Sequence, residues 1–315
     1  MKRRDFLGRF VGGMAAAGLA GHVSGLRASG QGHASRAGWD GKLHEIAIST
    51  WSLHNYFQIT RDEDFKLPGD MLDLLDFPEM IVDRYKVHHL EICAPHFAST
   101  EAGYLQDLKA RLQKAHTHVV NMPVDIEELW TEGGLSDANP QVRDKAVAAC
   151  KKWIDIGGEI GTRSVRCDPG KMNPQKLEPT VAAYKELAAY GNSRGVYVII
   201  ENHGGVGSEH PEELVKLFKD VDSDFFGALP DFGNFPDEQT RERGLELLFP
   251  FASVVCHAKG LEIDSQGKET KFDFPRCIAT SKKMGFKGIY SIEYEGPGDP
   301  YAGVQKVLNE LVEYL

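Results

Sequence analysis

The sequence has little of several features that would assign it to a specialised class of protein. Its five cysteines are odd in number and have no Cys-x-x-Cys spacing, which argues against a zinc knuckle or a complete disulfide framework. It has no run of about 18 apolar residues that could cross a membrane. Positive charge is also scarce, with 36 Lys and Arg against 46 Asp and Glu. The resulting net charge of -10 argues against nucleic acid as a partner.

The composition is otherwise that of an ordinary globular protein. Hydrophobic residues make up 42% of its 315 residues, and the mean hydropathy is -0.33. A chain of this length can bury one large core or divide into two small domains. We expect one main domain.

The N-terminus has the charge pattern of an export signal. The first seven residues, MKRRDFL, are basic, and a modest apolar run follows from Phe10 to Ala20. Arg3 and Arg4, with the apolar pair that follows them, resemble a twin-arginine signal. We therefore predict that residues 1–41 are a signal peptide and disordered linker, and that the protein is periplasmic or extracellular. The alternative is a basic amphipathic helix on the mature protein, but Gly is too frequent here for a good helix.

A rhythm of strand and helix begins near residue 42 and repeats eight times. Strands are predicted at His44–Trp51, Val87–Ala94, His118–Pro123, Thr162–Cys167, Val196–Glu201, Phe226–Asp231, Ser253–His257 and Gly288–Glu293. Helical patterns separate them, and we expect Asp76, Thr100 and Asn139 to cap three of these helices. The pattern predicts a closed (β/α)8 TIM barrel, an α/β fold, over residues 42–315. An open doubly wound sheet is the alternative, but no Gly-x-Gly-x-x-Gly follows the first strand.

Two connections that leave the carboxyl ends of strands are long. They cover residues 57–69 and 125–139. Barrels build their active sites from loops at this face. We predict that these loops form walls or lids of a substrate pocket, with a plain surface insertion as the alternative.

Acidic and imidazole side chains stand at the ends of four consecutive predicted strands. The most conspicuous strand is VYVIIE, which is apolar enough to be buried on both faces and ends in a carboxylate that needs a cationic partner. The carboxyl ends of barrel strands meet in one small volume, so their ligands should converge. They would suit one divalent ion such as Mn, Mg, Zn or Co, and they are Glu201, Asp231, His257 and Glu293. The alternative is a buried salt-bridge cluster completed by Lys259 and Arg166.

Four motifs, IIENHGG, PDFGN, HAKG and IEYEG, occur in this order. They resemble the xylose-isomerase-like TIM barrels of the sugar phosphate isomerase and epimerase family, and the resemblance covers residues 42–315. It implies one divalent metal on the four strand-end residues, with Glu201 and Glu293 exchanging a proton with the carbon beside the substrate carbonyl. The residues suit this chemistry, because a Lewis acid stabilises an enediolate and two carboxylates can remove and return its proton.

Neighbouring polar residues are candidates for catalysis and substrate binding. His203 is a candidate proton carrier, and Lys259 could stabilise an oxyanion. Asn234 stands where ketose epimerases usually carry a histidine, and Glu295 competes with Glu293 as the eighth-strand ligand. Aromatic, charged and amide groups at strand ends could line a sugar pocket, and the predicted substrate-binding residues are Trp51, His54, Glu91, His96, Asn121, Arg166, Asn234 and Glu295.

The sequence thus predicts a metal-dependent sugar isomerase or epimerase that acts by α-proton abstraction through an enediolate. The substrate would be a free sugar, a keto-sugar or a sugar derivative, since phosphorylated sugars are cytoplasmic. A lyase or dehydratase acting on a 3-keto-glycoside or an inosose-like compound would use the same ligands. A non-catalytic periplasmic sugar-binding protein and a metal-dependent sugar hydrolase are further alternatives. We expect no nucleic-acid partner and no stable membrane insertion after export, and the sequence leaves homo-oligomerisation open.

Overall fold

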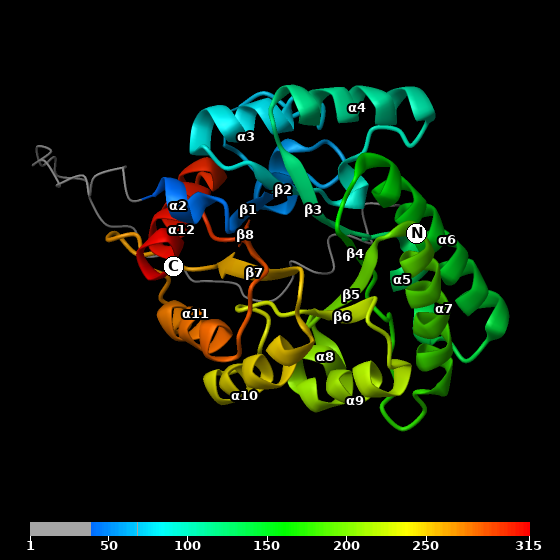
Figure 1. The fold of residues 1–315 in the computed structure, drawn as a ribbon. Helices are drawn as coiled ribbons and strands as arrows, with labels where there is room; N and C mark the ends of the chain where they lie inside the picture. The colour runs from blue at the N-terminus through cyan, green and yellow to red at the C-terminus, as the bar shows by residue number, and fades with distance from the viewer. Residues whose placement is uncertain (1–38, 68) are drawn as a thin grey trace, which may run out of the picture.

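The computed structural model describes residues 39–67 and 69–315, and over these residues the chain is a TIM barrel. Eight strands form one parallel sheet in the order β6-β5-β4-β3-β2-β1-β8-β7. Figure 1 shows the strands at the centre of the molecule and the helices around them. The strands are β1 (Ile46–Ser49), β2 (His89–Glu91), β3 (His118–Pro123), β4 (Ser164–Arg166), β5 (Tyr197–Glu201), β6 (Phe226–Leu229), β7 (Val255–Gly260) and β8 (Ile289–Tyr294).

The sheet closes between its two edge strands, β6 and β7. The N–H of His257 donates to the carbonyl of Pro230 at 2.9 Å, and the N–H of Phe232 donates to the carbonyl of His257 at 3.2 Å. These bonds form an isolated parallel bridge between Asp231 and His257, just beyond the end of β6. The seam of the barrel therefore lies at two of the predicted metal ligands.

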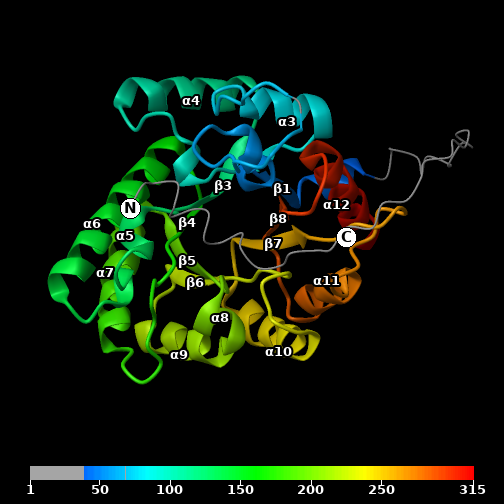
Figure 2. The same ribbon diagram turned by 180° about the vertical axis from the view of Figure 1, so that it is seen from behind.

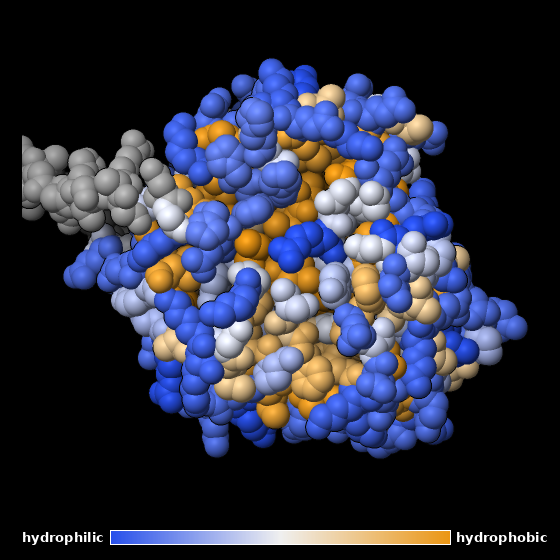
Figure 3. Space-filling view, in the orientation of Figure 1, coloured by the Kyte–Doolittle hydropathy of each residue, from blue (hydrophilic) through white to orange (hydrophobic). Residues whose placement is uncertain are grey.

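The main helices cover the outside of the barrel, as the front and back views show (Figures 1 and 2). Their buried faces are apolar and their outer surfaces are mostly hydrophilic (Figure 3). This amphipathic pattern is what a helix needs when one side packs on a sheet and the other faces water. These helices are α3 (Phe77–Tyr85), α4 (Ala102–Lys114), α6 (Pro140–Ile160), α7 (Glu178–Arg194), α9 (Pro211–Val221), α10 (Glu238–Leu248), α11 (Phe274–Lys283) and α12 (Pro300–Tyr314).

Shorter helical segments occupy several connections. Among the described residues, none of the helices is long and apolar enough to span a membrane. The short segments are α2 (Asp40–Leu43), η2 (Thr50–Tyr56), η3 (Ala94–His96), α5 (Glu127–Trp130), η4 (Gly134–Ser136), α8 (Gly205–Glu209) and η5 (Phe249–Phe251). The predicted twin-arginine motif lies outside the described residues.

The predicted strands all occur, although most are shorter than predicted. Strand β3 has the predicted bounds, whereas β7 continues beyond His257 to Gly260, so that Lys259 lies within the strand. The caps were predicted less well. Asn139 accepts a hydrogen bond from the N–H of Gln141 as expected, but Asp76 makes no side-chain cap hydrogen bond. Thr100 was a wrong assignment, because the helix begins one residue later with Glu101 at the N-cap position.

The interior of the barrel has an apolar layer and a polar layer above it. The apolar layer contains small and branched side chains from six strands and the residue before β7, namely Ala47, Val120, Ile199, Leu229, Val254, Val255 and Ile289. Side chains two residues apart on a strand share a face. The residue two beyond Ile199 is Glu201, and the residue two beyond Val255 is His257. These apolar side chains therefore form a buried layer directly below the polar groups at the strand ends.

Helix α6 packs closely on the barrel at one of two adjacent glycines. A Cβ atom added to Gly157 would lie 2.7 Å from Cγ2 of Thr162 and 3.3 Å from Cγ1 of Val165. A Cβ atom on Gly158 would meet its nearest neighbours at 3.8 Å or more, which is ordinary contact. Gly157 thus permits the close approach of the helix to β4, whereas the approach does not depend on the absence of a side chain at Gly158.

We predict opposite effects for the same substitution at these two glycines. Gly157→Ala should lower the free energy of unfolding by about 1–3 kcal/mol, because overpacking outweighs the gain in helix propensity. Gly158→Ala should raise it by about 0.5–1 kcal/mol, because the propensity gain acts alone. Urea unfolding followed by circular dichroism measures both. Equal effects at the two positions would contradict the described packing of α6.

Candidate active site and metal centre

A cavity of about 580 Å³ opens at the carboxyl ends of the strands. Both long connections contribute to its wall, as predicted. The first supplies Asp62 and Phe65, and the second supplies Asp125 and Trp130. Glu201 and Glu293 also line the cavity. The cavity is within the size range of small-molecule sites, roughly 300–1,000 Å³.

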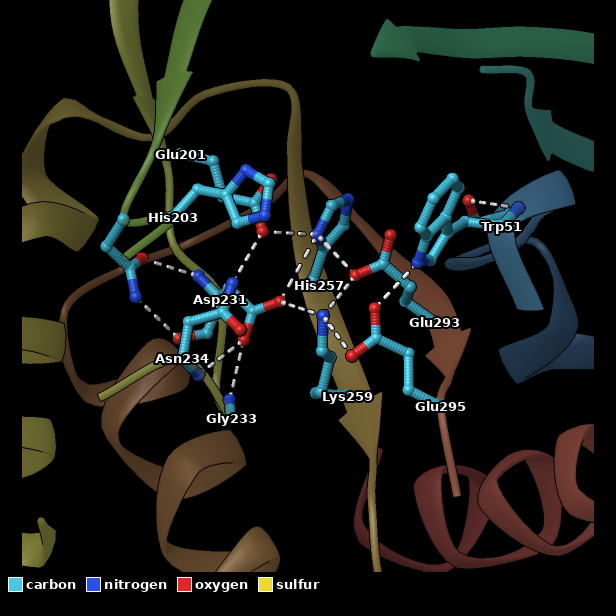
Figure 4. Close-up of polar contacts among 12 residues, drawn as sticks. Trp51, Glu201, His203, Asp231, Gly233, Asn234, His257, Lys259, Glu293 and Glu295 are labelled. Atoms are coloured by element: carbon cyan, nitrogen blue, oxygen red, sulfur yellow. Dashed lines mark hydrogen bonds and ion pairs between the residues drawn. The ribbon is translucent and has the colours of Figure 1, made fainter. Parts of the chain in front are cut away.

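The four predicted metal ligands come together. One potential ligand atom from each of Glu201, Asp231, His257 and Glu293 lies within 4.8 Å of the others. All four residues are buried, with exposed fractions of 5% or less. Nδ1 of His257 is the shared neighbour, at 3.2 Å from Glu201 Oε1, 3.3 Å from Asp231 Oδ2 and 3.4 Å from Glu293 Oε2. Figure 4 shows His257 between Glu201 and Asp231 on one side and Glu293 on the other.

Backbone groups orient Asp231 toward this cluster. Its Oδ1 accepts hydrogen bonds from the N–H groups of Gly233 and Asn234, at 2.6 and 2.9 Å. Its main chain is held by the Asn202 side chain, which accepts from the Asp231 N–H at 2.7 Å and donates to the Asp231 carbonyl at 3.1 Å. The other carboxylate oxygen, Oδ2, is buried and makes no hydrogen bond. A buried carboxylate oxygen held in this way is suited to coordinate a cation.

The charge around His257 points to the same conclusion. The described residues place seven carboxylates in one network of ion pairs, and only two permanent cations, Arg166 and Lys259, join it. The carboxylates remain in excess even if His203 and His257 are both protonated. Burial lowers the pKa of His257, but Glu293, Glu91 and Glu201 outweigh it and raise this pKa well above its usual value. The residues therefore fit a divalent cation.

The two permanent cations occupy different sides of the cluster. Arg166 contacts Glu201 and Asp125, and its Nε lies 3.5 Å from Asp168. Lys259 Nζ lies 2.6 Å from Glu293 Oε2 and 3.5 Å from Asp231 Oδ2. Salt bridges to both cations were the predicted alternative to a metal site, and they are present beside the ligand cluster.

The electrostatic environments of Glu201 and Glu293 differ. Burial raises the pKa of Glu201, but Arg166 and His257 outweigh it, so this pKa lies well below its usual value. Burial dominates at Glu293 and raises its pKa to about 7, against the pull of His257 and Lys259.

His203 belongs to a second group that was only partly foreseen. Its Nδ1 lies 3.1 Å from Oδ2 of Asp168, and ligand atoms of Asp125, Asp168 and His203 lie within 4.8 Å of one another. Arg166 already pairs with both aspartates, so we assign no cation here. Burial lowers the pKa of His203, but Glu201 and Asp168 outweigh it and raise this pKa to about 9.

Asp125 and Asp168 were missed as site residues. Asp168 follows β4 by two residues, in RCDPG, and therefore shows the same signal of an acid after a buried strand that identified the ligands. Asp125 follows the end of β3 by two residues. Applying the strand-end criterion to β3 and β4 would have found both.

The predicted substrate-binding residues fall into two groups. Five line the cavity, namely Trp51, His54, Arg166, Asn234 and Glu295. Glu295 does not approach His257 as a ligand and instead accepts from Nε1 of Trp51 at 2.6 Å and pairs with Lys259 at 3.2 Å. Asn234 donates to Oε1 of Glu201 at 2.9 Å. These positions are compatible with contact to a ligand in the cavity.

The other three, Glu91, His96 and Asn121, do not line the cavity. His96 is 5% exposed, and its ring nitrogens lie 2.8 and 3.0 Å from the hydroxyls of Thr50 and Thr60. Glu91 and Asn121 are fully buried inside the barrel and bond to each other. The short turn η3 places His96, and the side chains of Glu91 and Asn121 are buried inside the barrel on β2 and β3. Contact of these three residues with a substrate stays a prediction.

The family follows from a comparison with known sequences. The profile of the xylose isomerase-like TIM barrel family matches residues 81–313. The chain belongs to this family. The predicted resemblance is thereby confirmed at the level of family and fold, and a search of curated proteins found no significant match.

Solved structures with the same fold are distant in sequence. The IOLI protein with a bound zinc atom is 14% identical, with a TM-score of 0.65 over 86% of this chain and 99% of that one. A xylose isomerase-like TIM barrel protein from Mycobacterium smegmatis in complex with magnesium is 14% identical, with a TM-score of 0.59 over 86% and 97%. The 3-keto-D-glucoside 4-epimerase YcjR from E. coli is 14% identical, with a TM-score of 0.60 over 85% and 98%.

Removal of Arg166 should destabilise the protein far more than removal of an exposed arginine. Arg166→Met leaves buried carboxylates without their cation and should cost about 3–5 kcal/mol. Arg194 pairs with Asp155 at 2.7 Å, and both side chains are 47% exposed. Arg194→Met should therefore lower the free energy of unfolding far less than Arg166→Met does. Denaturant unfolding of both variants in the presence of a chelator tests this, and a cost below 1 kcal/mol for Arg166→Met would contradict the network.

Proposed function

We propose that this protein is a divalent-metal-dependent sugar isomerase or epimerase. The observation that carries the proposal is the placement of Glu201 and Glu293. Both line the cavity and approach Nδ1 of His257 from different sides, whereas Asp231 and His257 lie fully buried behind them (Figure 4). Two carboxylates that face one cavity across a metal site can act on the two faces of a flat intermediate.

The metal would be held by Glu201, Asp231, His257 and Glu293. When bound, a divalent cation supplies Lewis acidity that polarises a carbonyl group. Mn, Mg, Zn and Co remain the candidates, since the donor set of three carboxylates and one imidazole accepts each of them. The neighbours crystallised with magnesium and with zinc support a metal at this type of barrel.

The two glutamates would carry the proton. One carboxylate removes the proton from the carbon beside the carbonyl; the C–H electron pair moves into the carbon–carbon bond, and the carbonyl π pair moves onto its oxygen, to give an enediolate. Return of a proton by the opposite carboxylate to the same carbon inverts its configuration. Return of a proton to the neighbouring carbon, with transfer of the hydroxyl proton to the former carbonyl oxygen, moves the carbonyl. Lys259, with Nζ at 2.6 Å from Glu293 Oε2, is placed to stabilise the developing negative charge.

The cavity walls would bind the sugar. Trp51, Phe65 and Trp130 present aromatic surface to the cavity, and aromatic rings pack well on the C–H faces of sugars. Arg166 and Asn234 are placed to hydrogen-bond hydroxyl groups. The 3-keto-D-glucoside 4-epimerase among the structural neighbours supports a keto-sugar or a keto-glycoside as the substrate class.

A lyase is the second candidate because one specific feature favours it. It would use the same enediolate but break the bond between the β-carbon and its leaving group, which requires a proton donor for that group. His203 lines the cavity, and Asp168 fixes its Nδ1 at 3.1 Å. Its Nε2 could then protonate the departing oxygen, as oriented histidines do in acid–base catalysis.

The first experiment measures metal content and proton exchange on the same protein. Purified wild type should hold about one equivalent of divalent metal, and the Asp231→Ala/His257→Ala variant should hold almost none, because two of four ligands are lost. In D2O, wild type should catalyse metal-dependent uptake of deuterium beside the carbonyl of a keto-sugar or 3-keto-glycoside substrate. Because Glu201 is also a proposed ligand, Glu201→Gln is assayed at saturating metal, where it should slow this exchange by about 10²–10⁴-fold, far more than it changes sugar affinity.

Each alternative has its own outcome in this experiment. Metal binding and sugar binding without exchange, with only an affinity change in Glu201→Gln, would indicate a non-catalytic binding protein. Cleavage of a glycoside without exchange would indicate a hydrolase, and exchange with loss of a β-substituent would indicate a lyase. A folded wild type that takes up no metal would reduce the four residues to a salt-bridge cluster and contradict the proposal.

The proposal includes export by the twin-arginine route. Arg3 and Arg4 carry this part of it, and they lie outside the described residues. This route carries folded proteins, so the metal site could be filled before export. Replacing both arginines by lysine should leave the protein inside the cell, as fractionation and immunoblotting would show. Replacing Lys2 by Arg is the matched control and should leave export unchanged, whereas continued export of the double variant would contradict this route.

A further inference from the structure

The two ring nitrogens of His257 face different surroundings. Nδ1 faces the ligand carboxylates, whereas Nε2 lies 3.0 and 3.1 Å from the two oxygens of Glu91. Both side chains are fully buried, so water does not compete for this contact. A neutral imidazole carries one N–H, and the nitrogen without it has the lone pair that a metal needs. A carboxylate beside Nε2 keeps the proton on Nε2 and leaves Nδ1 available.

Glu91 is itself held by two further strands. Its Oε2 accepts from Nδ2 of Asn121 at 2.8 Å, and Oδ1 of Asn121 accepts from the hydroxyl of Ser164 at 2.8 Å. The amide of Asn121 therefore has a donor on one side and an acceptor on the other. The chain of contacts from Ser164 through Asn121 and Glu91 to His257 joins β4, β3, β2 and β7.

The backbone aligns this chain through an irregularity between β2 and β3. Leu90 pairs with Val119, but the next residue, Glu91, pairs with Asn121, so Val120 is skipped. Asn121 then pairs directly with Ser164 on β4. Bulges of this kind redirect side chains and are frequent beside active sites. Here the shift brings Glu91, Asn121 and Ser164 side by side.

We propose that Glu91 is a positioning residue for the metal site, which it controls through the tautomer and ring orientation of His257. This inference rests on the proposed metal site. Glu91 does not line the cavity, so it would act on the metal-binding residue His257 and not on the substrate. Carboxylates behind a ligating histidine commonly change metal affinity by about 10–100-fold. Asn121 supports the role by fixing one oxygen of Glu91.

The test is the metal affinity of Glu91→Gln, measured with Zn²⁺ and Co²⁺ against a competing chelator. The amide can donate to Nε2 and so favour the wrong tautomer, and we expect affinity to fall by about 10–100-fold. The visible spectrum of bound Co²⁺ should change as well, because His257 is displaced or reoriented. Both readouts are independent of turnover.

Glu310→Gln is the matched control. Glu310 is also a buried glutamate, 3% exposed, but it lies on α12 and accepts from the N–H of Glu269 at 2.8 Å. This variant should keep wild-type metal affinity. An equal loss in both variants would assign the effect to general destabilisation and overturn the inference.

A second variant covers the case in which Glu91→Gln does not fold. Asn121→Ser removes one hydrogen bond to Glu91 and should weaken metal binding by several-fold in the same direction. Folded Glu91→Gln with the affinity and Co²⁺ spectrum of wild type, or folded Asn121→Ser with unchanged affinity, would overturn the inference. Wild type that binds no metal would instead contradict the proposed function, so the two failures are distinguishable.

Discussion

The concentration of carboxylates around His257 is the constraint on which the rest of the site depends. Four acidic side chains lie within 3.4 Å of its ring nitrogens, and all of them are buried, with exposed fractions of 5% or less. Charges of one sign in a poorly solvated place repel one another strongly, so the fold must supply counter-charge. Arg166 and Lys259 supply part of it, and both are almost fully buried in consequence. The carboxylates that remain in excess are what a bound divalent cation would balance in the proposed metal site.

In this barrel, the residues that would hold a metal and those that form the outer wall of the cavity belong to different parts of the chain. The groups that would hold a metal stand on or directly after strands, and the backbone around Asp231 is fixed by Asn202 and by the turn at Gly233. The outer cavity is built instead from the connections that carry Phe65 and Trp130. Loops can change without disturbing strands. Proteins of one fold can therefore keep similar strand-end residues and differ in the ligands that their loops admit.

Much of this arrangement could be predicted from the sequence, for a definite reason. Each ligand follows an apolar run, and the order of strands around a barrel follows the order of the chain, so strand ends converge without further information. Register could not be predicted in this way. The register shift between Leu90 and Glu91 places Glu91 beside Asn121 and in contact with His257. No feature of the local sequence predicts this shift. The position of His96 could not be predicted either, because a single 3₁₀ turn after β2 directs its ring between two threonines.

The closure of the barrel between β6 and β7 has a structural consequence for the proposed metal site. Strands β6 and β7 are the two ends of an otherwise continuous ladder, and the bridge between Asp231 and His257 closes it. Formation of that bridge during folding brings two of the four ligands to their final positions. A cation that binds both residues would cross-link the two edge strands of the sheet, much as a disulfide links two parts of a chain. The same ion would then keep the cylinder shut, and its loss would loosen the protein first along that line.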